Sequence, residues 1–531
     1  MKSGEKYNRR SFIKTIGLAG AILPFLQYCS QKTKTLLLKI SGTNHVLGHR
    51  LWAKNFPKPS EDIKIPILIV GSGISGLSAA RYLALNSNTD FLICEMENRI
   101  GGNSSYGENK HSKFPFAAHY LPLPNKEDVE LISFLKESRM YLGDDYHGQP
   151  ILDDYQLVFP QEERLFYKNV WQSGLIPQKG VSKESQDEVE RFLKLMTDYR
   201  EKKDRIGKYW FTIPLHDSSD EVEAKMLDKI TFSDWLKKQN FRSEELLWYL
   251  NYSCKDDYGF GISEVSAWAG IHYFAGRKHN WCPERNDQVF TWPEGNARLT
   301  KYLSKHSKSK SLQQHLIYQV EETKDAVEVL MYDAVHNTSK RILADKVIMC
   351  TPQFVNNYLF KNRKVTSFKY VPWLVATLTL KKEFGLNEQL SWDNVIFGAE
   401  GLGYIYNQHQ NLDQNIGEKV ISFYLSFTDS DTLKSRKKLL SMSDLDLKNL
   451  VLADLKKAHP LIEDLILEIE FNKIGHAMIA PIPNHIFGEE TKLARQNINN
   501  KIFFAHSDLS GISIFEEAFH QGIRAAKEVL K

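Results

Sequence analysis

Residues Ile65–Gly102 read IPILIVGSGISGLSAARYLALNSNTDFLICEMENRIGG, and this stretch decides the fold. It begins with an almost unbroken apolar run, Ile65–Val70, which is typical of a strand buried on both faces of a parallel sheet. The glycine-rich turn Gly71–Gly76 follows at once and leads into a helical pattern over Leu77–Leu85. A G-x-G-x-x-G turn between a strand and a helix predicts a dinucleotide-binding domain.

Each residue of the turn has a separate expected role. Gly71 permits the tight turn, Gly73 lets the backbone approach a diphosphate, and Gly76 lets helix and strand pack closely. Ser72 and Ser75 complete the turn and are expected to face the same ligand. The helix that follows directs free N–H groups and the positive end of its dipole at the phosphates.

A carboxylate follows at the distance that a dinucleotide site requires. A second predicted strand, Phe91–Cys94, ends in Glu95. This acid lies about 20 residues beyond the glycines, where a carboxylate accepts hydrogen bonds from ribose hydroxyls. The alternative is a glycine-rich turn in an α/β domain that binds no nucleotide. Strand, helix and acid at this spacing favour the dinucleotide site.

The residues after Glu95 carry a resemblance to a known family. Arg99 and then the pair Gly101 and Gly102 follow the acid. This pattern resembles the flavin amine oxidase superfamily, which includes polyamine and monoamine oxidases and phytoene desaturase-like enzymes. The resemblance implies FAD rather than NAD, because R-x-G-G does not usually follow the ribose acid of plain NAD dehydrogenases. It implies non-covalent FAD, because no cysteine resembles the flavin-linking residue of monoamine oxidases.

Later segments resemble the same family. Val320 matches a strand residue whose backbone contacts the adenine, and Asp508 matches the acid at the ribityl or diphosphate part of FAD. The last helix is expected to point its N-terminus at the flavin, and Glu517 there replaces a usual glycine. The cofactor contacts implied by these resemblances are Gly71, Ser72, Gly73, Ser75, Gly76, Glu95, Arg99, Gly101, Gly102, Asn103, Ser104, Val320, Asp508, Phe515 and Glu516.

The resemblance also implies the architecture. We expect an α/β fold with a Rossmann-like FAD-binding domain of the glutathione reductase type, assembled from three chain segments, and an α+β substrate domain with an antiparallel sheet. The predicted division is a signal peptide at 1–29, a leader or linker at 30–62, FAD-binding segments at 63–124, 288–365 and 476–531, a mostly helical cap segment at 125–287 and a substrate-domain sheet at 366–475.

Two histidines are the candidate catalytic residues. His119 lies in Lys113–Pro122, which resembles the family segment that runs along the flavin ring, and an unperturbed pKa of about 6.5 suits proton transfer at neutral pH. The alternative is a histidine hydrogen-bonded in a packed loop. His272 lies in the aromatic run Ser266–Ala275. A core histidine is the commoner explanation for it, and a wall of the substrate cavity is the other.

A lysine common in the family is absent. Many amine oxidases carry a lysine near flavin N5 on the first strand of the substrate sheet, and Val371–Leu380 contains none. Three functions therefore stay open: hydride removal from a C–N bond of a small amine, desaturation of a C–C bond in an apolar substrate, and binding without turnover. Oxygen or a membrane-linked carrier is the expected electron acceptor. Two alternatives stay open for Asp256 and Asp257: they attract a cation, or they lie at the solvated end of a loop.

The N-terminus resembles an export signal. Asn8–Lys14 resembles the twin-arginine motif, and the apolar run Thr15–Leu26 is too short to span a bilayer as a mature helix. We expect the twin-arginine translocase to deliver the folded protein to a bacterial periplasm; the alternative is a basic amphipathic start of a cytosolic protein. Cys29 ends a loose lipoprotein box, so a lipid anchor, ordinary cleavage and a buried cysteine all stay open.

Composition excludes few other functions. The chain has 531 residues, of which 42% are hydrophobic and 25% charged, and its net charge of +4 gives no basic footprint for nucleic acid. The five cysteines do not fall at metal-ligand spacing, so no metal is expected. Cys254 and Cys282 leave one disulfide open. The sequence predicts no oligomeric state.

Overall fold

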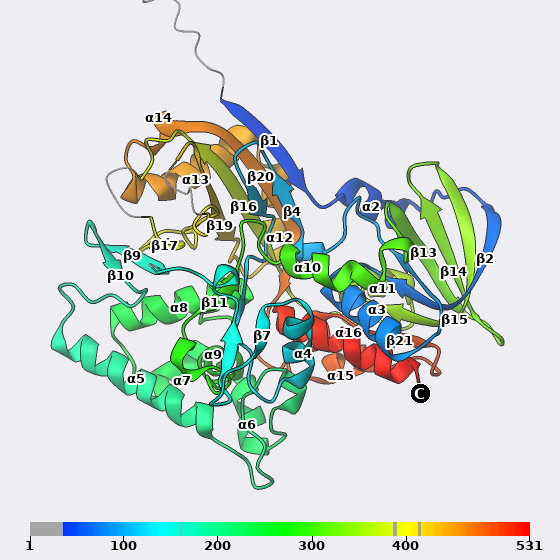
Figure 1. The fold of residues 1–531 in the computed structure, drawn as a ribbon, viewed down its shortest axis with the longest axis horizontal. Coiled ribbons are helices and arrows are strands. Elements are labelled where there is room, and N and C mark those ends of the chain that lie inside the picture. The colour runs from blue at the N-terminus through cyan, green and yellow to red at the C-terminus, as the bar shows by residue number, and fades with distance from the viewer. Residues whose placement is uncertain (1–35, 161, 386–389, 412–415) are drawn as a thin grey trace, which may run out of the picture.

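The computed structural model describes residues 36–160, 162–385, 390–411 and 416–531, and these residues form two large sheets joined by helices (Figure 1). A seven-stranded sheet lies on one side of the molecule, and an eight-stranded sheet and a group of helices lie on the other. The expected α/β architecture with two domains is therefore confirmed.

The seven-stranded sheet takes its strands from three distant parts of the chain. They are β2 (Pro59–Val70), β3 (Phe91–Cys94), β12 (Ser311–Leu312), β13 (His315–Glu322), β14 (Val327–Asp333), β15 (Thr338–Met349) and β21 (Ile502–Phe504). β2, β3, β12, β15 and β21 pair in parallel, whereas β13 and β14 add an antiparallel meander. β15 unites the two parts, because its residues 338–344 pair with β14 and its residues 347–349 pair with β21.

Both faces of this sheet are buried, as the apolar run in β2 predicts. Ile67 and Ile69 pack in one core with the helices α3 (Ile74–Asn86) and α16 (Phe515–Val529), whereas Leu68 and Val70 pack in another with the meander. α3 and α16 lie side by side (Figure 1). The sheet is therefore a central layer, and its glycine turn sits between strand and helix.

Glycines set the closest approaches in this layer. A Cβ on Gly76 would lie 2.0 Å from the carbonyl oxygen of Gly71, and one on Gly522 would lie 2.1 Å from that of Ser75. No side chain fits at such distances, so Gly76 has the packing role that the motif predicts. Gly522 allows α16 to lie directly against α3.

The eight-stranded sheet forms the substrate domain. In spatial order its strands are β1 (Leu37–Gly42), β20 (Ile466–Ile479), β16 (Tyr370–Leu380), β19 (Lys419–Ser426), β18 (Tyr404–Tyr406), β17 (Asp393–Ile396), β9 (Glu163–Tyr167) and β10 (Val170–Ser173). β20, β16, β19 and β18 form its antiparallel centre, as expected. Three helices lie between β19 and β20 in the chain: α12 (Thr432–Ser441), α13 (Asp444–Ala458) and α14 (Ile462–Leu465). Leu447, Val451 and Leu455 of α13 pack in the core of this sheet.

The cap segment is mostly helical and also contains two strand pairs, β7–β8 and β9–β10. Its helices are α4 (Val129–Glu137), α5 (Lys183–Glu201), α6 (Val222–Met226), α7 (Phe232–Lys238), α8 (Glu244–Tyr258) and α9 (Ala267–Ala275). β9 and β10 of this segment join the substrate sheet, because β9 pairs with β17. The remaining elements are β4 (Tyr106–Glu108), β5 (Lys113–Pro115), β6 (Tyr120–Pro122), β7 (Tyr141–Asp144), β8 (Pro150–Leu152), β11 (Val289–Thr291), α10 (Ala297–Leu303), α11 (Gln353–Leu359) and α15 (Glu489–Arg495).

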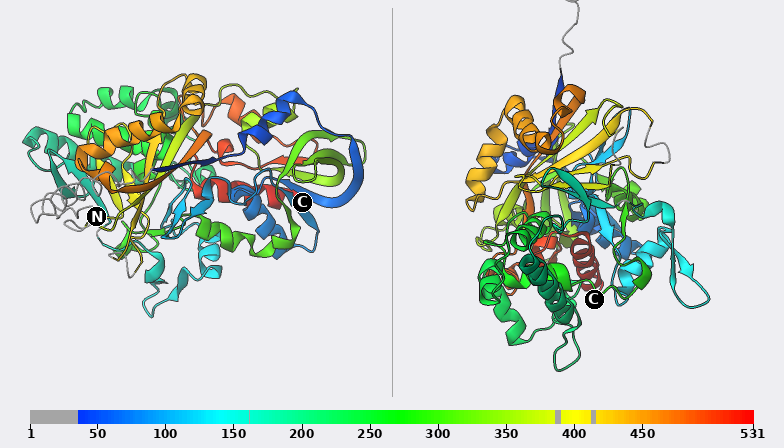
Figure 2. Two further views of the ribbon diagram at one scale, coloured as in Figure 1. Left: turned by 90° about the horizontal axis from the view of Figure 1, so that it is seen from above. Right: turned by 90° about the vertical axis from the view of Figure 1, so that its left-hand side faces the viewer.

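Residues 36–58 differ from the expected leader or linker. β1 adds an edge strand to the substrate sheet, and α2 (His45–Ala53) packs Leu47 and Leu51 against Leu316 and Tyr332. β1 pairs with β20 and α2 packs on the other domain, so tertiary contacts give this segment regular structure. It connects the two domains, because β1 lies in one sheet and β2 begins the other (Figure 2).

Three further expectations concern export and cysteines. The predicted export signal at 1–29 lies outside the described residues. Within the described part of the chain, no helix is both long and apolar enough to cross a membrane. Cys254 and Cys282 are free and buried, so they do not form the disulfide that the sequence left open.

Candidate active site

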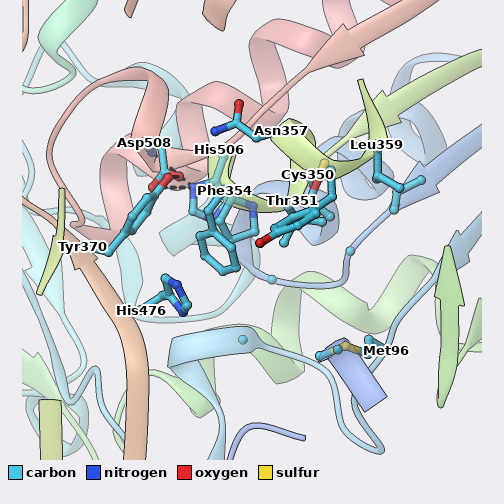
Figure 3. Close-up of a pocket in the computed structure, with 18 of the residues that line it drawn as sticks. Met96, Cys350, Thr351, Phe354, Asn357, Leu359, Tyr370, His476, His506 and Asp508 are labelled. Carbon is cyan, nitrogen blue, oxygen red and sulfur yellow. Dashed lines mark hydrogen bonds and ion pairs between the residues drawn. The ribbon is translucent and has the colours of Figure 1, made fainter. Parts of the chain in front are cut away.

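A cavity of about 2030 Å³ opens at the carboxyl ends of β2, β15 and β21 (Figure 3). The strand register places Val70, Met349 and Phe504 side by side there. Ligands of open α/β sheets bind outside these ends. Because pockets for a single drug-sized ligand measure about 300–1,000 Å³, this one has room for a dinucleotide.

The glycine turn leaves space for phosphate. Gly71 has a φ of +101°, which an L side chain rarely adopts. A Cβ on Gly73 would meet no atom within 4 Å, and no side chain caps the helix that begins after it. The first N–H groups of α3 therefore stay open to the cavity. This geometry fits a dinucleotide diphosphate.

Glu95 holds the turn in place. Its Oε2 accepts hydrogen bonds from the backbone N and the Oγ of Ser72, both at 2.7 Å. Its Oε1 accepts one from the backbone N of Glu97 at 2.9 Å. Oε1 keeps a lone pair, and the residue lines the cavity, so a ribose hydroxyl can still bind it.

Most residues predicted to contact the cofactor surround this cavity. Those that line it are Gly71, Gly73, Ser75, Glu95, Gly101, Gly102, Asn103, Ser104, Val320, Asp508 and Phe515. Those that do not reach the lining are Ser72, Gly76, Arg99 and Glu516. Arg99 donates to the carbonyl oxygen of Gly42 at 3.2 Å, and its guanidinium lies 4.4 Å from the centre of the Phe116 ring. Which of these residues bind FAD stays a prediction.

Asp508 organises one wall of the cavity (Figure 3). Its Oδ2 accepts hydrogen bonds from the Tyr370 hydroxyl at 2.5 Å and from the backbone N of Gln353 at 2.9 Å. Its Oδ1 lies 2.9 Å from Nδ1 of His506. Burial opposes ionisation, but His506 and these hydrogen bonds hold the pKa of Asp508 below its usual value. The buried carboxylate is therefore ionised and positions its neighbours.

His119 lies at the border between the cofactor cavity and the substrate domain. The preceding residue, Ala118, lines the cavity. The His119 ring centre lies 4.8 Å from that of Tyr424, 4.9 Å from that of Tyr120 and 5.8 Å from that of Trp392. Burial lowers the pKa of His119 to about 4, so its imidazole is neutral at pH 7. The ordinary pKa assumed from sequence is therefore wrong for this residue.

Four carboxylates, which we call the acidic cluster, face one another beyond His119. Asp256 and Asp257 lie at the end of α8, Asp393 begins β17 and Glu163 begins β9. Burial and repulsion by neighbouring carboxylates raise the pKa of Asp256 to about 8. The pKa values of Asp257 and Glu163 rise to about 7, and burial is the main cause for both. Burial and the same neighbours raise the pKa of Asp393 as well. Asp256, Asp257 and Asp393 are half-buried and Glu163 is exposed, so all four side chains keep contact with solvent.

Tyrosines surround the acidic cluster. Burial raises the phenol pKa of Tyr120, Tyr252, Tyr273 and Tyr424, and neighbouring carboxylates of the cluster raise each of them further. These hydroxyls are therefore neutral at physiological pH. Their rings lie beside the carboxyl groups, and aromatic faces attract cations.

Arg277 does not neutralise the acidic cluster. Its Nη1 lies 2.6 Å from Oε1 of Glu516, which is buried in the first turn of α16. The two members of this ion pair have opposite effects on the pKa of Asp257: Arg277 lowers the pKa and Glu516 raises it. The charge of the pair is balanced, and the raised pKa values leave the carboxyl groups of the cluster partly protonated near pH 7.

His272 lies away from these residues. It is 3% exposed, its ring stacks on Trp268 at 4.8 Å, and its Nε2 lies 3.1 Å from the carbonyl oxygen of Thr212. Burial lowers its pKa to about 3. The structure thus favours the core histidine over the catalytic one. β16 is buried throughout and contains no lysine, as the sequence indicated.

Sequence reasoning missed several of these residues. Asp393, Glu163 and Arg277 come from separate elements, and no spacing along the chain signals that they meet. Asp256 and Asp257 were visible as a pair after an apolar helix, but the solvated loop end considered for them is wrong, because α8 extends through both. His506 immediately precedes the Ser507-Leu509 turn and had no motif to mark it.

Comparisons with known proteins agree on one family. The sequence model described as flavin containing amine oxidoreductase matches residues 74–530. The fold is similar to putrescine oxidase bound to putrescine, with a TM-score of 0.61 and 15% identity over 88% of this chain and 99% of that one. It is also similar to cyclohexylamine oxidase from Brevibacterium oxydans IH-35A, with a TM-score of 0.60 and 14% identity over 88% of this chain and 97% of that one. A search of curated proteins gave no match.

Proposed function

This chain belongs to the flavin-containing amine oxidoreductase family and is an FAD-dependent oxidoreductase, and on that premise we propose that it oxidises a small cationic amine at a C–N bond. When bound, FAD accepts the hydride from the carbon beside the nitrogen. The protein must hold this carbon in a dry, oriented site and make the ammonium nitrogen neutral before hydride removal.

The acidic cluster carries this proposal. Burial, with neighbouring carboxylates, raises the pKa values of its carboxyl groups, so a positively charged ligand would stabilise their ionised forms. Aromatic rings beside the cluster add cation–π attraction for an ammonium group. An apolar substrate would cover these polar carboxyl groups without offering them a charged or hydrogen-bonding partner, which disfavours desaturation of a C–C bond.

Asp256 is the best candidate for taking the substrate proton. A pKa of about 8 lies near neutral pH, where a general base is most effective. Its neighbours Asp257 and Glu163, at about 7, provide further acceptors in the same space. His119, with a pKa of about 4, is a weak base and is better suited to shape the wall between this space and the cofactor cavity.

A panel of amines tests this function. The purified yellow protein is mixed without oxygen with monoamines, diamines and polyamines, and loss of flavin colour is recorded. We expect at least one cationic amine to bleach the flavin, and Asp256→Asn to slow that bleaching. Bleaching by apolar alkenes or carotenoid-like compounds but by no amine would overturn the proposal.

We also propose that the protein is exported by the twin-arginine route. The motif around Arg9 and Arg10 supports this, and the route carries folded proteins, which suits a cofactor loaded in the cytoplasm. Replacing both arginines by lysine should leave the protein in the cytoplasm. Unchanged delivery to the periplasm would refute the route. A lipid anchor at Cys29 would appear as a mass addition that Cys29→Ala removes.

A further inference from the structure

Several basic side chains outside the sequence motif line the cofactor cavity, among them Lys54, Lys361, Arg363, Lys364 and Lys437, and two further ones lie on elements that flank the cofactor site. Arg436 comes from α12 of the substrate domain, and His506 follows β21. Neither was expected from the sequence. Both face the same cavity as the glycine turn, but from other walls.

Arg436 is a half-buried guanidinium without a carboxylate partner. Its Nε donates to the carbonyl oxygen of Gly475 at 2.7 Å, which leaves its terminal nitrogens for another acceptor. In the part of the chain that the structure describes, no acidic side chain pairs with it. A desolvated cation that lacks an acidic partner indicates that an anion completes the site.

Contacts along the wall bring Arg436 to the glycine turn. Gly101 forms a β-bridge with Gly73 of the turn, and Asn103 donates to the carbonyl oxygen of Ala477 at 2.7 Å. Ala477 is two residues from Gly475, to which Arg436 is bonded. β20, to which Arg436 is bonded, is therefore connected to the glycine turn through Asn103, and both Arg436 and the turn line the same cavity.

His506 is held in a fixed orientation. Its Nδ1 lies 2.9 Å from Oδ1 of Asp508 and 3.2 Å from the backbone N of Asp508. In the imidazolium form Nδ1 donates to the carboxylate, and in one neutral form it accepts from the amide. Nε2 carries a proton in both of these forms, and a phosphate beside it would favour them over the other neutral form, in which Nδ1–H donates to the carboxylate and Nε2 only accepts. Asp508 itself has few lone pairs left to accept further hydrogen bonds, because its Oδ2 already accepts from Tyr370 and Gln353.

We propose that Arg436 and His506 bind the diphosphate of FAD, opposite the N–H groups of the glycine turn. Arg99, the arginine of the motif, donates to Gly42 instead and does not line the cavity. Because Arg436 belongs to the substrate domain, the cofactor would join the two domains through its phosphates. The inference rests on FAD as the cofactor.

Binding of FAD and of ADP to the full-length chain freed of flavin tests this assignment. ADP carries the diphosphate but no flavin ring. We expect Arg436→Gln and His506→Gln each to weaken both ligands by about tenfold or more, as for a lost charge-assisted hydrogen bond. Lys434→Gln is the matched control, since Lys434 loses the same charge from the same helix and its side chain is 76% exposed. That control should leave both dissociation constants unchanged.

Each other outcome contradicts the assignment. Unchanged affinity for FAD and ADP in both variants would show that neither cation binds the cofactor. Weaker FAD with unchanged ADP would place the cations at the flavin end. If a glutamine variant unfolds, Arg436→Lys retains the charge, and it should bind FAD more weakly than the wild type because a single ammonium cannot bind bidentately. A wild-type chain that bound neither ligand would instead count against FAD as the cofactor.

Discussion

Asp256→Asn tests whether the acidic cluster favours a cationic substrate at the expense of stability. A carboxyl group with a pKa of about 8 in the folded protein and 3.8 as its ordinary value binds a proton that the unfolded chain releases. Stability therefore falls as pH rises between these two values. Asn has nearly the same shape and cannot ionise, so the variant escapes this loss.

The pKa shift of Asp256 sets an upper limit on the gain in folding stability of the variant. About four pKa units correspond to at most ~6 kcal/mol at pH 8. Water in the space beside Asp256 and relaxation of its neighbours reduce this, so we expect the variant to be more stable than the wild type by ~2 kcal/mol. At about pH 5 the difference should shrink to less than half, because only about one unit separates that pH from the unfolded pKa.

Thermal unfolding and flavin reduction together provide the assay. The melting temperature of the FAD-loaded variant should exceed that of the wild type at pH 8, and kcat/KM for the best amine should fall about 10- to 100-fold. Asp187→Asn, which removes an exposed carboxylate on α5, serves as the control and should change neither quantity. A variant that is less stable than the wild type at pH 8 and reacts equally fast would refute the reasoning.

Other perturbations give distinct results. Gly73→Val should fold normally but purify without yellow colour, because the side chain meets no protein atom and instead fills the space for the diphosphate; a yellow Gly73→Val protein would contradict this placement. His119→Ala should slow flavin reduction by less than about tenfold, since a base with a pKa of about 4 contributes little at pH 7; stopped-flow kinetics that show a larger loss would restore it as the base. Denaturation should release free FAD into the supernatant, and flavin that stays with the precipitate would indicate a covalent bond. His272→Gln should lower the melting temperature and leave the bleaching rate unchanged, because His272 lies in the core.

Much of the FAD-binding domain could be predicted because its signals are local. A buried strand, Gly71–Gly76 and Glu95 lie within one βαβ unit, where strand, turn and helix are consecutive in the chain. The resemblance also extended to Asp508, far away in the sequence. Its neighbour Tyr370 could not be placed, because β16 approaches Asp508 only through the fold, whereas His506 lies two residues before Asp508 but had no motif to mark its contact.

The substrate side was less predictable for the same reason. The acidic cluster is assembled from α8, β9 and β17, and the raised pKa values depend on enclosure that no sequence pattern records. His119 was found by resemblance, but its lowered pKa follows from burial among Tyr120, Tyr424 and Trp392. Residues 36–58 were misjudged because β1 and α2 gain their structure from distant partners.

The most direct test of amine oxidation compares an amine with its neutral analogue. The holoprotein is mixed anaerobically with a cationic amine from the panel and, separately, with the alcohol of the same carbon skeleton, and the flavin absorbance and the carbonyl product are measured in one turnover. The proposed function predicts that the amine bleaches the flavin and yields one equivalent of aldehyde or ketone per flavin, whereas the alcohol leaves the flavin oxidised. Equal bleaching by both compounds, or bleaching by neither while an apolar substrate succeeds, would contradict it.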